Sequence, residues 1–210
     1  MNNKPKRTRC TFNDAMIEQC KQFATQSLPT SSDQYARRNQ DASKVYRQII
    51  QLTNGKLGEE LAYACYSKYY PNLSRVDYEI YSKESKSWEP DLTDPILGVR
   101  LAVKTKDNRD ALQYGASWIF ELSDRKIFGS NLDGKNLDPN QYCCLVIVDQ
   151  IKKWGQIMAC VKLQWLHDNN LFTKPDRDYL STKLTVRLEN MQKVISDPGE
   201  LWQLPIPANQ

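Results

Sequence analysis

The chain has 210 residues, of which 40% are hydrophobic and 26% charged, and its formal net charge is +4. This length favours one compact domain, and no apolar run is long enough for a membrane span. The mild positive charge permits nucleic-acid binding without requiring it. Because the polar N-terminus also lacks the apolar core of a signal peptide, we expect a cytoplasmic protein.

Histidine and cysteine set limits on the possible chemistry. The six cysteines include no Cys-x-x-Cys spacing, and His167 is the single histidine, so structural zinc is not expected. The cysteines are expected to be reduced and mostly buried. Serine hydrolases and histidine-dependent nucleases would all have to rely on His167, which lies beside no nucleophile signature. We expect it to be a partly exposed helix residue.

The first 53 residues are predicted to form a basic arm followed by helices. The arm carries Lys4, Lys6, Arg7 and Arg9. A DNA-contacting arm and a solvated terminus explain this cluster equally well. Helices are expected over residues 13–26, capped by Asn13, and over residues 34–53. Asn54-Gly55 should then interrupt the chain.

The region 54–165 is predicted to be the core. A helix over residues 57–70 should bury Leu57, Leu61, Ala64 and Cys65 and end at Pro71. Alternating patterns predict strands over residues 76–80 and 99–104, with a short strand over 88–92 between them. In the strand 99–104, Leu101 and Val103 face the core, so Ala102 and Lys104 share the opposite face.

The remaining elements complete the predicted fold. We expect a helix over 110–120, a strand buried on both faces over 143–148, a strand over 156–162 and a short helix over 165–172. Residues 166–210 form a helical and extended C-terminal region of the same compact domain. The order of these elements predicts an α/β fold with a mixed central sheet flanked by helices.

An acidic residue and a lysine lie on two neighbouring predicted strands. Asp91 follows Pro90, and Lys104 ends the strand that contains Ala102. Pairing of the strands would place Asp91 beside the face that carries Lys104. Mg²⁺ prefers one or two carboxylates together with waters and phosphate oxygens. A lysine nearby can position the attacking water and stabilise the anionic transition state, so this arrangement indicates phosphodiester hydrolysis.

These residues resemble the motif of the PD-(D/E)XK nuclease superfamily, which includes many type II restriction endonucleases. Pro90-Asp91 matches the first half of the motif, and Ala102-Val103-Lys104 occupies the second half. Gly58-Glu59-Glu60-Leu61-Ala62 is similar to the segment that opens the first core helix in several of these families, where the glutamate joins the metal site. The resemblance implies a restriction-endonuclease-like core and a homodimer that cuts double-stranded DNA with Mg²⁺, or with Mn²⁺ as a substitute.

Position 102 departs from the motif, because alanine stands where an acidic residue is expected. Glu59 or Glu60 would supply the second carboxylate, or the alanine replaces an acid of an active parent, or the domain binds DNA without cutting it. The predicted catalytic set is Asp91, Lys104, position 102 and Glu59, and the predicted metal ligands are Asp91, Glu59 and Glu60. Asp77 is a possible extra ligand. Each of these residues also has a structural explanation as a turn cap, a solvated lysine or a first-turn helix acid.

Two basic segments are candidates for DNA contact. One follows the motif and contains Lys106, Asn108 and Arg109, and the other contains Arg37 and Arg38. Both are equally consistent with a solvated surface. Besides a restriction enzyme, a repair or junction-resolving nuclease of the same fold and a non-catalytic DNA-binding module remain open.

Overall fold

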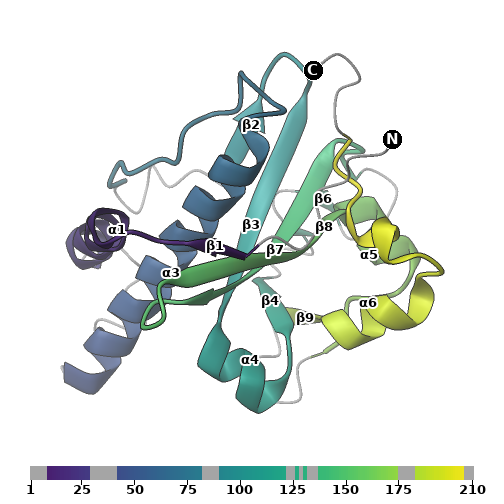
Figure 1. Cartoon of the computed structure of the whole chain (residues 1–210). Helices are drawn as coiled ribbons and strands as arrows, with labels where there is room; N and C mark the ends of the chain where they lie inside the picture. The colour runs from purple at the N-terminus through teal and green to yellow at the C-terminus, as the bar shows by residue number, and fades with distance from the viewer. Residues whose placement is uncertain are drawn as a thin grey trace.

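The computed structural model of the chain describes residues 9–28, 42–81, 90–121, 126–127, 130–131, 137–174 and 183–205. The predicted mixed α/β fold is confirmed: a five-stranded mixed sheet curls into a half-barrel with helices around it (Figure 1). In chain order the elements are β1 (Arg9–Thr11), α1 (Asp14–Ser27), α3 (Ala42–Tyr66), β2 (Leu92–Asp94), β3 (Val99–Asp107), α4 (Asn108–Tyr114), β4 (Ser117–Glu121), β5 (Lys126–Ile127), β6 (Ser130–Asn131), β7 (Gln141–Asp149), β8 (Trp154–Lys162), α5 (Leu163–Asp168), β9 (Lys183–Arg187), α6 (Leu188–Val194) and the 3₁₀ helix η2 (Pro198–Leu201).

The main sheet has the strand order β1-β8-β7-β3-β2. Strands β3 and β7 are parallel, and α4 lies on the connection between them, whereas the other neighbours pair antiparallel. Parallel neighbours need such a crossover because a tight turn cannot join them. Every residue of β7 is buried, which confirms the prediction of a central strand covered on both faces.

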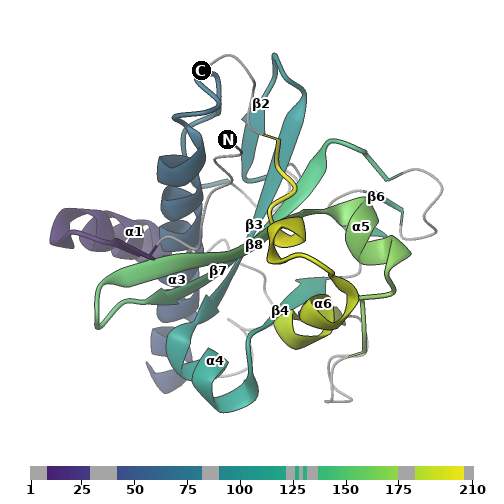
Figure 2. The ribbon, with the colours of Figure 1, turned by 45° about the vertical axis from the view of Figure 1, so that its right-hand side comes forward.

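Two hydrophobic cores lie on opposite faces of the sheet. Helices α3 and α1 cover one face, where Leu101 and Val103 of β3 meet Leu57 and Leu61 of α3. The other face packs against α5, α6 and the two-stranded ribbon β4–β9, as Figure 2 shows. The alternation along β3 therefore sorts its side chains between the two cores as the sequence predicted.

Helix α3 corrects two predictions. It runs without a break from Ala42 to Tyr66, so Asn54-Gly55 does not interrupt it, and the predicted boundary at residue 53 lies inside it. The reason is tertiary: the side chain of Asn54 is buried and bonded to Asp107 and Gln150, which fixes this turn against the sheet. The helix ends at Tyr66, before Tyr70, and Ala64 is exposed.

Other differences follow from long-range pairing. Residues 76–80 belong to no strand, so that prediction is wrong. The predicted helix 110–120 is α4 followed by strand β4, because Gly115 turns the chain with a φ of 79° and β4 then pairs with β9. Strand β9 and helix α6 were not predicted, and the predicted boundary at residue 165 lies inside α5. Part of the predicted strand 88–92 lies outside the described residues.

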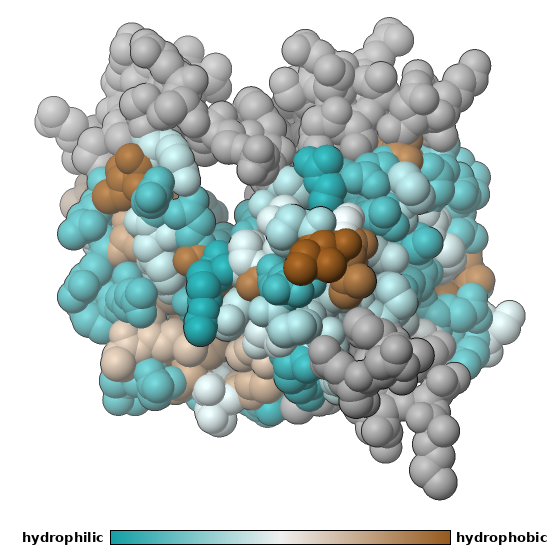
Figure 3. All heavy atoms as spheres, turned by 90° about the horizontal axis from the view of Figure 1, so that it is seen from above, coloured by the Kyte–Doolittle hydropathy of each residue, from teal (hydrophilic) through white to brown (hydrophobic). Residues whose placement is uncertain are grey.

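The described surface in Figure 3 is mostly hydrophilic, and the cysteines form no disulfide. Seen from above, described side chains are mostly hydrophilic, and apolar ones form small separate patches (Figure 3). None of the helices in the described part of the chain has the length and apolar character needed to cross a membrane. The six cysteines are free thiols, four of them buried. His167 is a half-buried residue of α5, as expected.

Candidate functional site

The site lies at the point where strand β2 stops pairing with β3. The two strands pair only at Leu92 with Leu101, Thr93 with Arg100 and Asp94 with Val99. Beyond this point a side chain replaces the strand partner of β3: Oδ2 of Asp91 accepts a hydrogen bond of 2.6 Å from the backbone N–H of Val103. This bond fixes Asp91 at the edge of the sheet, between the two faces.

Helix α3 brings a second carboxylate to this edge. Gly58 packs so closely on β3 that a Cβ added to it would lie 1.9 Å from Oγ1 of Thr105. The next residue, Glu59, lies close enough to Asp91 for the charge of Asp91 to raise the pKa of Glu59. The Nζ of Lys56 donates to Oε2 of Glu59 at 2.7 Å, and both side chains are only 13% exposed. The ammonium group of Lys56 also lies 4.7 Å from the ring centre of Phe23.

The electrostatics of the two carboxylates indicate a shared site. Burial, and after it the charge of Asp91, raise the pKa of Glu59 to about 8, even though Lys56 acts to lower it. Burial also raises the pKa of Asp91, and the Val103 N–H, Lys104 and Lys56 lower it. Two carboxylates that are costly to ionise together are typical of a site that binds a cation or a proton.

Lys104 and Ala102 face the other core. Ala102 is fully buried and pairs with Cys143 of β7, whose side chain lies in the second core. The Nζ of Lys104 lies 5.8 Å from the ring centre of Phe120, and its charge is close enough to lower the pKa of Asp91. The predicted sharing of one face by Ala102 and Lys104 is therefore found, and Asp91 lies between that face and the face covered by α3.

Glu60 and Asp77 point to other partners. Glu60 accepts a hydrogen bond of 2.9 Å from the hydroxyl of Tyr78, which also lies 3.4 Å from the thiol of Cys20. Asp77 is exposed and accepts hydrogen bonds from the Glu79 N–H and the Tyr81 hydroxyl. Asp77 contributes to the raised pKa of Glu59, but only as the weakest of the named causes. Of the two adjacent glutamates, only Glu59 joins Asp91.

The residues after the motif line the far end of β3. Lys106 donates to Oγ of Ser117 at 3.3 Å, and Asn108 donates to Oδ2 of Asp149 at 3.0 Å. Arg109 is exposed, and its Nε lies 3.4 Å from Oδ1 of Asp107, which raises the pKa of the guanidinium. Among the three, Arg109 is the most accessible for contact with a ligand. Arg37 and Arg38 lie outside the described residues.

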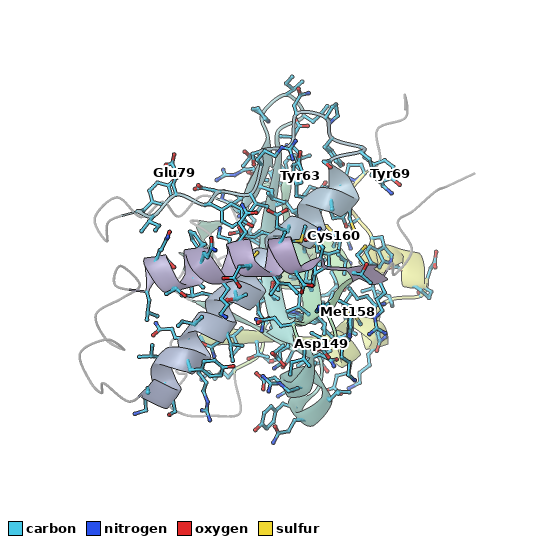
Figure 4. All side chains as sticks on the ribbon, turned by 60° about the vertical axis from the view of Figure 1, so that its left-hand side comes forward. Tyr63, Tyr69, Glu79, Asp149, Met158 and Cys160 are labelled. Atoms are coloured by element: carbon cyan, nitrogen blue, oxygen red, sulfur yellow. The ribbon has the colours of Figure 1, made fainter. Side chains whose placement is uncertain are left out.

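The two carboxylates at this end of β3 accept hydrogen bonds on all their oxygens. Oδ1 of Asp107 caps α4 by accepting from the Arg109 N–H, and Oδ2 accepts from Asn54. Oδ1 of Asp149 accepts from the Lys152 N–H, and Oδ2 accepts from Asn108. Figure 4 labels Asp149 in the lower part of the view. With all four oxygens bonded, Asp107 and Asp149 act as structural caps.

The donor set at Asp91 and Glu59 fits Mg²⁺. The described residues contain no group of three or more histidine, cysteine, aspartate or glutamate side chains that could hold a metal ion. Two oxygen-donating carboxylates are nevertheless the usual protein contribution to a Mg²⁺ site, in which waters and substrate phosphates complete the coordination.

One residue of the site, Lys56, was missed in the sequence. Its signal was its position three residues before Glu59, because side chains at this spacing meet on one helix face.

Comparison with known proteins finds no match: no family model, no curated protein and no solved structure matches this chain.

Proposed function

We propose that this chain is a Mg²⁺-dependent DNA endonuclease, and that a type II restriction enzyme is the class that fits it best. The observation that carries the proposal is the approach of two half-buried carboxylates, Asp91 and Glu59, at a strand edge with a lysine on either side. If this sheet edge had only a structural role, a second acid would not stabilise it, because burying like charges together costs free energy.

Each residue has a role in this proposal. Asp91 and Glu59 would hold the divalent ion, and a bound ion would neutralise charge on the phosphate and activate a water. The Val103 N–H holds the Asp91 carboxylate in place, and Lys56 compensates the charge of Glu59. Lys104, on the opposite side of Asp91, orients the attacking water and stabilises the negative charge that develops on the phosphate.

The alanine at position 102 is consistent with this assignment. Glu59 supplies a second carboxylate from α3, which favours the explanation in which the ligand comes from the helix and not from β3. An acid at position 102 would be fully buried beside Cys143, on the face that carries Lys104. The variant Ala102→Glu therefore tests whether the site accepts a third carboxylate or whether the alanine replaces a lost one.

The experiment is cleavage of long duplex DNA. The protein is incubated with Mg²⁺, with Mn²⁺ and with a chelator, alongside the variants Asp91→Asn, Lys104→Gln and Ala102→Glu. We expect discrete fragments with a divalent ion and none with the chelator, Asp91→Asn or Lys104→Gln. If neither the native chain nor Ala102→Glu cuts linear or branched DNA with either ion, catalysis is contradicted. Preference for branched DNA would instead support a repair or junction-resolving enzyme.

A non-catalytic DNA-binding module is the second candidate, and Ala102 is the observation that favours it. This alternative predicts DNA binding that weakens with salt but does not depend on a divalent ion. The homodimer belongs to the proposal through the resemblance alone. Sedimentation of the protein with and without DNA tests it, and a monomer in both conditions would contradict it.

A further inference from the structure

A stacked arginine lies beside the site in a place that no motif predicts. The guanidinium of Arg75 lies 4.8 Å from the ring centre of Tyr63. The side chain of Arg75 is exposed, and within the described part of the chain it forms no ion pair. An arginine held by an aromatic ring keeps its five N–H donors directed outward for an anion.

Two independent connections place this pair next to the carboxylates. Tyr63 follows Glu59 by four residues on α3, which puts it on the same helix face, about 6 Å farther along the axis. Ser74, the chain neighbour of Arg75, exchanges hydrogen bonds with Thr93, which lies two residues, or about 7 Å, beyond Asp91. Figure 4 shows Tyr63 and Tyr69 toward the upper end of the view, where α3 ends.

A second cation of the same kind extends this surface. The Nζ of Lys68 lies 4.7 Å from the ring centre of Tyr69, just beyond the end of α3, and Lys68 is exposed. Basic side chains next to aromatic rings are common on surfaces that bind nucleic acid. The rise of about 6 Å from Glu59 to Tyr63 along α3 is comparable with the spacing of neighbouring phosphates in one strand.

We propose that Arg75, held on the ring of Tyr63, binds a backbone phosphate close to the one held at Asp91 and Glu59. This inference rests on the proposed function, because it takes DNA as the substrate. Arg75 carries no sequence information in this role, since phosphate contacts fix the register of the duplex and base contacts read it.

The experiment measures the salt dependence of DNA binding, with a labelled duplex in chelator so that the strand stays intact. Arg75→Gln is expected to weaken binding roughly tenfold and to reduce the slope of log affinity against log salt by about 0.9, the value for one lost phosphate contact. Tyr63→Leu should weaken binding and reduce the slope nearly as much, because Arg75 loses the ring that holds it. Tyr63→Phe keeps the ring and should match the native protein.

The matched control is Lys193→Gln on α6, which makes the same change in charge at an exposed residue on the other side of the sheet. Its slope should stay native, because it contacts no phosphate in the proposed complex. An unchanged slope for Arg75→Gln overturns the inference, even if the native enzyme cuts DNA. A reduced slope in a protein that cuts no DNA upholds Arg75 and contradicts only the catalytic proposal. A native protein that binds no DNA overturns both.

Discussion

One pair of carboxylates ends strands β3 and β7, another lies where α3 meets the edge of β3, and the surroundings of the two pairs differ. The capping pair, Asp107 and Asp149, has all four oxygens bonded to backbone or amide donors. In the site pair, Asp91 and Glu59, other described residues donate to one oxygen of each, and the charge of Asp91 raises the pKa of its partner. Carboxylates whose oxygens all accept hydrogen bonds stabilise the fold, whereas carboxylates that repel each other are typical of a ligand site.

The sharpest way to break this comparison is to remove one charge from each pair. Asp91→Asn keeps the size of the side chain and an acceptor for the Val103 N–H. It should nevertheless lower the rate of DNA cleavage on the order of 1,000-fold, about 4 kcal/mol of transition-state stabilisation. Asp107→Asn, the matched change in the capping pair, should leave the cleavage rate of the folded protein within a few-fold of native. Equal losses in the two variants would remove the distinction between the pairs.

The pH dependence of stability tests the repulsion within the site pair. Glu59 has an ordinary pKa of 4.5 and a folded pKa of about 8, so between these values the folded protein retains a proton that the unfolded chain has released. The free energy of unfolding should therefore fall as the pH rises from about 5 to 8, by about 3 kcal/mol from Glu59. In Glu59→Gln this contribution disappears.

Urea denaturation of the two proteins in chelator, at several pH values across this window, measures the difference. The stability of Glu59→Gln relative to native should increase from low to high pH and then level off above pH 8. A constant difference across the window would show that Asp91 and burial do not disfavour the charged form of Glu59.

Two glycines of α3 test how the helix positions the site pair. Gly58→Ala places a Cβ 1.9 Å from Oγ1 of Thr105, so α3 must move away from β3. We expect a loss of stability of about 2 kcal/mol and slower cleavage, because Glu59 moves with the helix. Gly55→Ala has nothing within 4 Å of the new Cβ and should gain about 1 kcal/mol of stability. Thermal denaturation and cleavage rates compare the two, and similar effects would contradict the close contact.

The capping pair should show its role in stability alone. Asp149→Ala leaves the Asn108 amide and the Lys152 N–H without their acceptor at a largely buried position. The unfolding free energy should fall by about 2 kcal/mol, measured by urea denaturation. DNA cleavage per folded molecule should not change in this variant. A loss of cleavage without a loss of stability would assign Asp149 to the site.

Local signals explain which parts of the fold were predictable. Asn13 caps α1 and accepts from the Met16 N–H, as its position before the helix indicated. The run around Cys143 to Val148 is the buried central strand, because a strand covered on both faces needs apolar side chains at every position. Both predictions depend on neighbours along the chain and need no knowledge of the rest of the molecule.

Signals that come from distant partners were misread. Trp118 and Phe120 were expected in a helix but lie in β4, whose partner β9 lies about 70 residues later in the chain. Asn54-Gly55 looked like a break, but the bonds of Asn54 to Asp107 and Gln150 keep α3 continuous. Single-residue propensities are worth about 1 kcal/mol or less, so such tertiary contacts override them.

The sequence by itself determined the residue types of the candidate site and the alternation that separates Val103 from Lys104 across the sheet, because strand periodicity is a local property. Only the tertiary structure decided between Glu59 and Glu60, since neighbouring helix residues point about 100° apart and the contact of Gly58 with Thr105 sets the rotation of the helix. It alone also brought Arg75 onto the ring of Tyr63, because contacts between segments distant in sequence leave no signal in the sequence of either segment.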